Sequence, residues 1–259
     1  MEIIKVKLCS EKSRGCEKAP VEILKELGKI ESSESGKEIR FDNLNLEEIH
    51  VNLDNFNEAN HLIFENSKEA FEKNFKTFFV GGDGSICYSI IKAFDKVVDR
   101  GLLVVFDAHG DCLKEGDYSR AWLRKLIEDG FSGGRVILIG ARNLNVEERE
   151  FLKKNKVTLI GMDLLQEDLH EISDLVMERC RLSKGFYVSL DIDCVDSAYV
   201  PGVLDGEVGG LSSRQLIYFL KRLKMLDNFR GMDINGVDVD KDVNRMTIKL
   251  GAKLFGEMV

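Results

Sequence analysis

The feature that most constrains the fold is an alternation of short apolar segments with longer amphipathic ones. Several of the short segments, such as LLVVF at 102–106 and VILI at 136–139, are apolar without interruption. Strands covered by helices on both faces have this composition, whereas a strand with one face in water alternates apolar and polar residues. Such strands separated by helices predict an α/β fold, a three-layer sandwich with a mostly parallel central sheet.

The same pattern gives approximate bounds for the elements. Strands are expected at Ile3–Leu8, Ile49–Leu53, Thr77–Val80, Leu102–Phe106, Val136–Ile139, Val157–Ile160, Phe186–Leu190 and Gly231–Val237. Helices are expected at Val21–Leu27, Glu58–Lys73, Ser85–Asp99, Ser119–Glu128, Val146–Lys154, Leu165–Cys180, Ser212–Lys224 and from about Asp242 onward. We predict a single domain over residues 1–259, because no segment has the composition of a domain linker.

Composition narrows the class of protein. The net charge of -8 and the pI of about 5.2 argue against general binding of nucleic acid or of an anionic membrane. No apolar run approaches the ~20 residues of a membrane span, and MEIIKVKLCS at the N-terminus lacks the apolar core of a signal peptide. The 6 cysteines form no CxxC pair. They are expected to be reduced thiols, which predicts a cytoplasmic protein.

Acidic side chains gather after two of the predicted strands. Asp107, His109 and Asp111 follow one strand, and Asp191 and Asp193 follow another. If the chain stays extended, alternate residues point to one side, and ligands bind beyond the carboxyl ends of parallel strands. Carboxylates held close together need a cation, and oxygen ligands with an imidazole suit Mn²⁺. One such motif alone is better explained as a polar strand end in water, but the two together favour a metal site.

Three motifs, in order along the chain, resemble those of the ureohydrolase family: arginase, agmatinase and formimidoylglutamase. The chain reads GGDGS at 81–85, DAHGD at 107–111 and SLDIDCVDSAYVPG at 189–202, while IGAR at 139–142 and GGLSSRQ at 209–215 are weaker matches. The family patterns are Gly-Gly-Asp-His-Ser, Asp-Ala-His-x-Asp and Ser-x-Asp-x-Asp-x-x-Asp-Pro. The resemblance implies a three-layer α/β sandwich with a two-manganese centre, where a hydroxide attacks the trigonal carbon of a guanidinium or formimino group.

Residue roles carry over by position in the motifs. The resemblance implies that Asp107 and Asp191 bridge two metal ions and activate the nucleophile, that His109 and Asp193 complete one site, and that Asp111 belongs to the other. The implied cofactor is manganese, as one or two ions, with zinc, iron or nickel as alternatives. The implied partners are a small-molecule substrate and further copies of the chain, as a trimer or hexamer, with neither nucleic acid nor membrane.

The chain departs from the family pattern at three positions. Gly84 stands where the family has a histidine ligand of the second metal site, and Gly236 stands where the family has the glutamate that binds the guanidinium or amidine. Arg120 stands where many members have a proton-shuttling histidine. An arginine stays protonated, so it cannot shuttle protons, but it can bind a carboxylate or phosphate. Arg120 and Asp238 are the candidate substrate-binding residues, although Arg120 can also be a solvated charge at a helix start. Ser85 is expected to cap the helix after the glycine loop.

Other histidines and cysteines are given structural interpretations. His50, His61 and His170 are predicted to be surface or structural, and Cys87, Cys112 and Cys194 to be small buried groups. Three functions stay open. The favoured one is a divergent metal-dependent hydrolase of a linear C–N bond, amidine-like or guanidino-like, in a substrate other than arginine. The alternatives are a catalytically impaired binding or assembly subunit, and a one-metal hydrolase whose Asp107, His109 and Asp193 resemble the zinc site of histone deacetylases.

Overall fold

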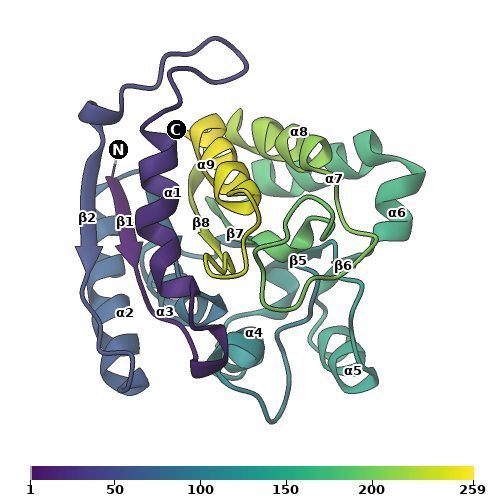
Figure 1. The fold of residues 1–259 in the computed structure, drawn as a ribbon. Coiled ribbons are helices and arrows are strands. Elements are labelled where there is room, and N and C mark those ends of the chain that lie inside the picture. The colour runs from purple at the N-terminus through teal and green to yellow at the C-terminus, as the bar shows by residue number, and fades with distance from the viewer. Residues whose placement is uncertain (1) are drawn as a thin grey trace.

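A central parallel sheet lies between two layers of helices in the computed structural model, which describes residues 2–259 (Figure 1). All strand pairs are parallel, and the strand order is β2-β1-β3-β8-β7-β4-β5-β6. The predicted α/β sandwich is therefore confirmed. Residue 1, the first of the predicted domain, lies outside the described residues.

The strands agree closely with the apolar runs. They are β1 Glu2–Val6, β2 Asn45–Ile49, β3 Thr77–Gly81, β4 Leu102–Phe106, β5 Val136–Ile139, β6 Thr158–Ile160, β7 Phe186–Asp191 and β8 Phe229–Asn235. The helices are α1 Ala19–Leu27, α2 Phe56–Lys73, α3 Cys87–Val97, α4 Tyr118–Glu128, α5 Val146–Lys154, α6 Met162–Glu167, α7 Leu169–Leu182, α8 Ser213–Lys224 and α9 Met246–Met258.

Both faces of the sheet are covered by helices, as the uninterrupted apolar strands require. In β4, Leu103 and Val105 pack in a core with residues of α2, α3 and α4. Leu102, Val104 and Phe106 pack in a second core with residues of α1, α7, α8 and α9. A strand with apolar neighbours on both sides gains from an apolar side chain at every position, so it shows no alternation. In the part of the chain that the structure describes, no helix combines the length and the apolar character needed to cross a membrane.

Strand β2 lies at Asn45–Ile49 rather than at the predicted 49–53. It is the edge strand beside β1, and its NLEEI segment is largely exposed. Glu48 forms ion pairs of 2.7 Å each with Lys5 and Lys7. The strand bounds predicted from Ile49–Leu53 are wrong. The position of this edge strand is determined by polar pairs with β1 and not by the burial of apolar side chains.

The helix predicted at Leu165–Cys180 is two helices, α6 and α7. Asp168 separates them in an extended conformation, and its side chain accepts a hydrogen bond of 2.9 Å from the backbone N–H of Glu171. An aspartate at this position caps the second helix and ends the first, since its backbone leaves the helical region. Helix α9 likewise begins at Met246 instead of near Asp242, because Asn244 and Arg245 adopt positive φ angles.

Candidate metal centre

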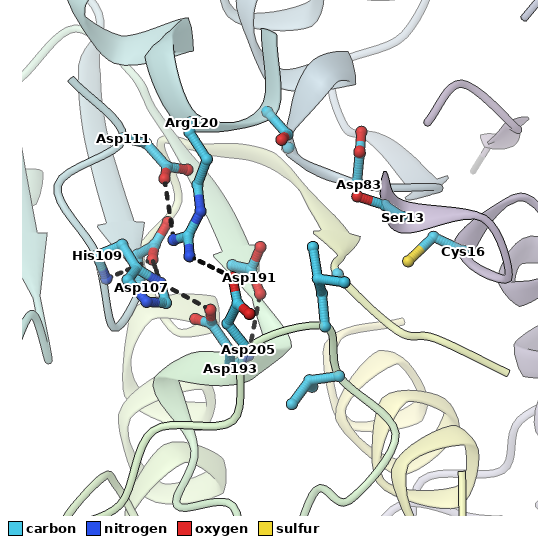
Figure 2. A pocket seen from close by; sticks show the side chains of 15 residues that line it. Ser13, Cys16, Asp83, Asp107, His109, Asp111, Arg120, Asp191, Asp193 and Asp205 are labelled. Carbon is cyan, nitrogen blue, oxygen red and sulfur yellow. Dashed lines mark hydrogen bonds and ion pairs between the residues drawn. The ribbon is translucent and has the colours of Figure 1, made fainter. Parts of the chain in front are cut away.

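Asp107 and Asp191 lie at the same edge of the sheet because β4 and β7 are neighbours in parallel register. Phe106 pairs with Leu190, so the next residue of each strand reaches the carboxyl edge at the same height. A cavity opens there (Figure 2). The residues predicted as metal ligands all line it: Asp107, His109, Asp111, Asp191 and Asp193.

The loop after β4 brings its acidic residues together by turning, not by staying extended. The backbone bends at Ala108 and His109, and Asp111 has a positive φ of 47°. The turn is held by the carboxylates themselves: the N–H of His109 donates to Asp107 Oδ1 at 2.7 Å, and the N–H of Ala108 donates to Asp193 Oδ1 at 3.1 Å. The expectation of an extended chain was wrong, although the side chains still line one cavity.

Asp107, His109 and Asp193 form the tightest group of candidate ligands. One atom from each lies within 4.8 Å of the other two. His109 Nδ1 is 2.9 Å from Asp193 Oδ2 and 3.6 Å from Asp107 Oδ1. Within residues 2–259, neither ring nitrogen of His109 makes a well-directed hydrogen bond, and the residue is only 5% exposed. A buried imidazole that lies close to carboxylates without a well-directed hydrogen bond marks a place where a ligand can complete the site.

The carboxylates around His109 favour a positive charge between them. Burial alone would lower the pKa of His109, but the carboxylates of Asp107 and Asp193 raise it to about 11. Two buried carboxylates thus stabilise the positively charged form of the imidazole between them. A divalent cation would supply this positive charge while the imidazole stays neutral. Oxygen ligands with one imidazole suit manganese or a similar metal. These three residues therefore fit a metal ion.

Asp191 and Asp111 complete the acidic wall of the cavity. Burial, and then like-charged neighbours, hold the pKa of each carboxyl well above its usual range. The N–H of Asp193 donates to Asp191 Oδ1 at 3.0 Å. Asp111 has a different environment: the indole Nε1 of Trp122 donates to its Oδ2 at 2.8 Å, and Arg120 Nη1 lies 3.9 Å from its Oδ1.

Arg120 points from the first turn of α4 into the cavity (Figure 2). Asp117 caps this helix, and its carboxylate accepts a hydrogen bond of 3.3 Å from the backbone N–H of Arg120. The guanidinium Nη2 donates to Asp205 Oδ2 at 2.7 Å. Burial opposes its charge, but the carboxylates of Asp111, Asp107 and Asp193 outweigh burial and raise the pKa of Arg120 above its ordinary value. Arg120 is thus a fixed cation inside the cluster, in contrast to a solvated charge at a helix start.

Gly84 faces the same cavity and has no room for a side chain. A Cβ atom there would lie 2.8 Å from the carbonyl oxygen of Ser119 and 3.4 Å from Trp122 Cδ1. The predicted cap at Ser85 is wrong: Asp83 occupies the N-cap position and accepts the hydrogen bond of 3.0 Å from the N–H of Ser85.

Gly236 and Asp238 differ in their relation to the cavity. Gly236 lines it with a φ of 82°, and a Cβ atom there would lie 2.3 Å from Asp191 Oδ1. No glutamate can stand at this position without moving Asp191. Asp238 is buried elsewhere, against Gly15, and accepts a hydrogen bond of 3.0 Å from the N–H of Asp240. Asp238 is not among the described residues that line the cavity, so its predicted contact with substrate gains no support.

Residues that sequence reasoning missed come mainly from the segment between β7 and α8. Glu207 Oε1 lies 3.5 Å from His109 Nε2, and Asp205 holds Arg120. Arg142, at the end of β5, fixes this segment by donating to the carbonyl oxygens of Asp193 at 2.9 Å and Glu207 at 2.8 Å. No motif predicts a functional role for Glu207 or Asp205, since an acidic residue in a polar segment is common. The IGAR motif contains Arg142, but it does not predict the contacts that Arg142 makes with this segment.

The remaining histidines and cysteines agree with their structural interpretations. His50, His61 and His170 are all exposed, and His170 Nδ1 hydrogen-bonds to the hydroxyl of Tyr218 at 2.6 Å. The three cysteines beside the motifs are buried, and burial raises their pKa values. Cys194 lies in a short 3-10 helix after β7.

Comparison with known proteins gives one consistent relationship. A sequence model described as the Arginase family matches residues 4–259. Arginase of Glycine max is 33% identical over 197 residues, covering 72% of this chain and 54% of that protein. Formimidoylglutamase of Bacillus subtilis (strain 168) is 26% identical over 223 residues, covering 81% and 69%. The chain spans about half the length of the plant arginases that it matches.

Solved structures show the same fold. Formimidoylglutamase from Bacillus subtilis superposes with a TM-score of 0.91 at 24% identity, covering 99% of this chain and 85% of that one. Proclavaminate amidino hydrolase from Streptomyces clavuligerus superposes with a TM-score of 0.88 at 23% identity, covering 99% and 89%. At these identities the likeness concerns the fold.

Proposed function

The chain belongs to the arginase family, and we propose that it is a divergent metal-dependent hydrolase of amidino-like or guanidino-like C–N bonds. The observation that carries this proposal is the buried His109 imidazole between the carboxylates of Asp107 and Asp193. One ligand atom from each of the three lies within 4.8 Å of the others, and neither ring nitrogen makes a well-directed hydrogen bond in the described chain. A divalent cation bound by these three groups would offset the cost of burying two carboxylates side by side.

The proposed division of labour follows from the contacts. Asp107, His109 and Asp193 would hold a divalent cation, which when bound lowers the pKa of water and polarises the substrate. The N–H groups of Ala108 and His109 keep Asp193 and Asp107 in place. In the reaction, water adds to the trigonal carbon, the C–N bond breaks, and a proton goes to the departing nitrogen. Asp191, half-buried beside Asp193, adds a further carboxylate to the cavity wall.

The substrate is proposed to differ from arginine. Gly236 supplies no carboxylate for a guanidinium, and its backbone packs too closely against Asp191 to accept a longer residue without a shift. Arg120 adds a positive charge to the cavity wall, which disfavours a cationic group beside it. An amidino or formimino compound that places no further cationic group beside Arg120 suits this cavity better than arginine does.

Turnover tests the proposal. The chain is loaded with Mn²⁺ and assayed for release of amine, ammonia or urea from a panel of guanidino, amidino and formimino compounds. We expect at least one compound to be hydrolysed and Asp193→Asn to lower kcat/KM at least 100-fold, because this change removes a proposed ligand. The exposed Asp227→Asn is the matched control and should keep wild-type turnover.

Gly84 and Gly236 supply no side chain where the family pattern has a histidine and a glutamate. This absence favours one alternative, a family member that binds ligands without turnover. A metal-replete, folded protein that hydrolyses no compound of the panel would support that alternative and overturn the proposed hydrolase.

A further inference from the structure

Asp111 is contacted by two groups of its own chain. Trp122 Nε1 donates to Oδ2 at 2.8 Å, and Arg120 Nη1 lies 3.9 Å from Oδ1, at the distance of a loose ion pair. Both groups come from α4. Asp111 is 4% exposed, so water has little access to it. A metal ion that used Asp111 would share the carboxylate with the indole and would lie close to the guanidinium.

The guanidinium of Arg120 is held from the opposite side as well. Its Nη2 donates to Asp205 Oδ2 at 2.7 Å, so the side chain spans the cavity from Asp111 to Asp205 (Figure 2). The guanidinium keeps its charge at every relevant pH. It brings a permanent positive charge into the acidic cluster beside Asp111. A second divalent cation bound to Asp111 would therefore meet a fixed like charge at close range.

Packing around Gly84 excludes a compensating ligand. The place where a side chain at this position would begin is filled by the first turn of α4, with Ser119 O at 2.8 Å from the Cβ position and Trp122 Cδ1 at 3.4 Å. Asp111 Oδ2 itself lies 3.5 Å from that position. Gly84 and Trp122 are thus packed together next to Asp111, and the indole occupies the space beside this carboxylate.

We propose that Arg120 takes the place of a second cation, so that the chain binds one divalent metal ion, through Asp107, His109 and Asp193. Trp122 supports this arrangement by fixing Asp111. The inference rests on the proposed metal-dependent function, and it assigns a structural cation to a position that the resemblance associates with a proton shuttle. It also removes Arg120 from the residues free to bind an anionic substrate, because its guanidinium is committed to Asp111 and Asp205.

Titration of the metal-free protein with Mn²⁺, followed by electron paramagnetic resonance, tests the inference without relying on activity. We expect wild type to bind one tight equivalent with the signal of an isolated ion, and Asp193→Asn to weaken it at least 100-fold. Arg120→Met should bind a second equivalent at least tenfold more tightly than wild type does. Arg124→Met is the matched control, since Arg124 lies on the same helix but donates to Cys112 O and Glu147; it should keep one equivalent.

Each outcome bears on a different claim. Two tight, spin-coupled ions in wild type would overturn the inference and leave the proposed hydrolase intact. Binding of a second ion that is the same in folded Arg120→Met as in wild type would also overturn it. No tight Mn²⁺ in wild type would overturn both proposals. The wild-type stoichiometry decides the matter even if Arg120→Met does not fold.

Discussion

Asp233 is a fully buried carboxyl group in β8, where it pairs with Ser189 of β7. Its Oδ1 accepts hydrogen bonds from Asn235 Nδ2 at 2.9 Å and from Ser189 Oγ at 3.2 Å. Its Oδ2 has no partner in the described chain, and neither does the hydroxyl of Tyr187. Burial raises the pKa of Asp233 to about 6, although these hydrogen bonds lower it again in part.

This shift predicts a pH-dependent stability difference for Asp233→Asn. Because the folded pKa lies above the ordinary value of 3.8, the contribution of Asp233 to stability is complete below about pH 4 and is lost as the pH rises through 6. The variant keeps a neutral group at every pH. Relative to wild type it should gain about 3 kcal/mol in free energy of unfolding between pH 4 and 7, and nothing more above. Urea unfolding at several pH values measures this difference.

The exposed Asp227→Asn serves as the control for Asp233→Asn and should show no such pH trend. A difference between Asp233→Asn and wild type that stays constant from pH 4 to 8 would mean that Asp233 is ionised in the native state throughout, contrary to its burial.

At the residue level, the sequence predicted groups that follow a buried strand and missed those that come from irregular segments. Asp107 and Asp191 could be placed because parallel strands deliver their next residues to one edge. The contact between Trp122 and Asp111 was not predictable, since a tryptophan in an amphipathic helix is normally core. Asp205 and Glu207 could not be placed because no periodicity relates their segment to the sheet.

Among the elements, the segment between β7 and α8 is bound at several points by one arginine. Arg142 donates to the carbonyl oxygens of Asp193 at 2.9 Å, Glu207 at 2.8 Å and Val208 at 3.0 Å. A guanidinium can serve several carbonyl groups at once because its donors form a planar fork. The backbone of the candidate ligand Asp193 is thereby tied to the segment that carries Glu207.

Arg142→Met should therefore destabilise both the fold and the metal centre. Several carbonyl groups lose their donor, which should cost about 2–4 kcal/mol in free energy of unfolding. Mn²⁺ affinity should fall about 10–100-fold, as for other residues that orient metal ligands. Urea unfolding and Mn²⁺ titration measure the two effects. The exposed Arg149→Met is the control; wild-type Mn²⁺ affinity in a folded Arg142→Met protein would contradict this role.

Element bounds were predictable where burial sets them and uncertain where polar contacts do. Strands β4 and β5 have the bounds that their apolar runs predict. The edge strand β2 does not, because its position depends on Glu48 pairing with two lysines. The break between α6 and α7 depends on the conformation of one residue, Asp168, which an amphipathic pattern does not reveal.

The molecule as a whole places an acidic cluster where its parallel strands end, and two layers of helices shield the strands themselves (Figure 1). The sheet order puts β7 between β4 and β8, so the strands that carry Asp107, Asp191 and Asp233 are adjacent. Helix α4 contributes Arg120 to the cavity and places Trp122 against Asp111. The fold is that of the arginase family, and on this account the cavity holds one metal ion beside His109, with Arg120 and Trp122 against Asp111.

The most direct test of this account is an anomalous difference map from crystals of the full chain grown with Mn²⁺, measured at the manganese edge. The account predicts one strong peak within coordination distance of His109, Asp107 and Asp193, with the guanidinium of Arg120 and the indole of Trp122 still against Asp111. A map with no peak beside His109, from protein saturated with Mn²⁺, would contradict it.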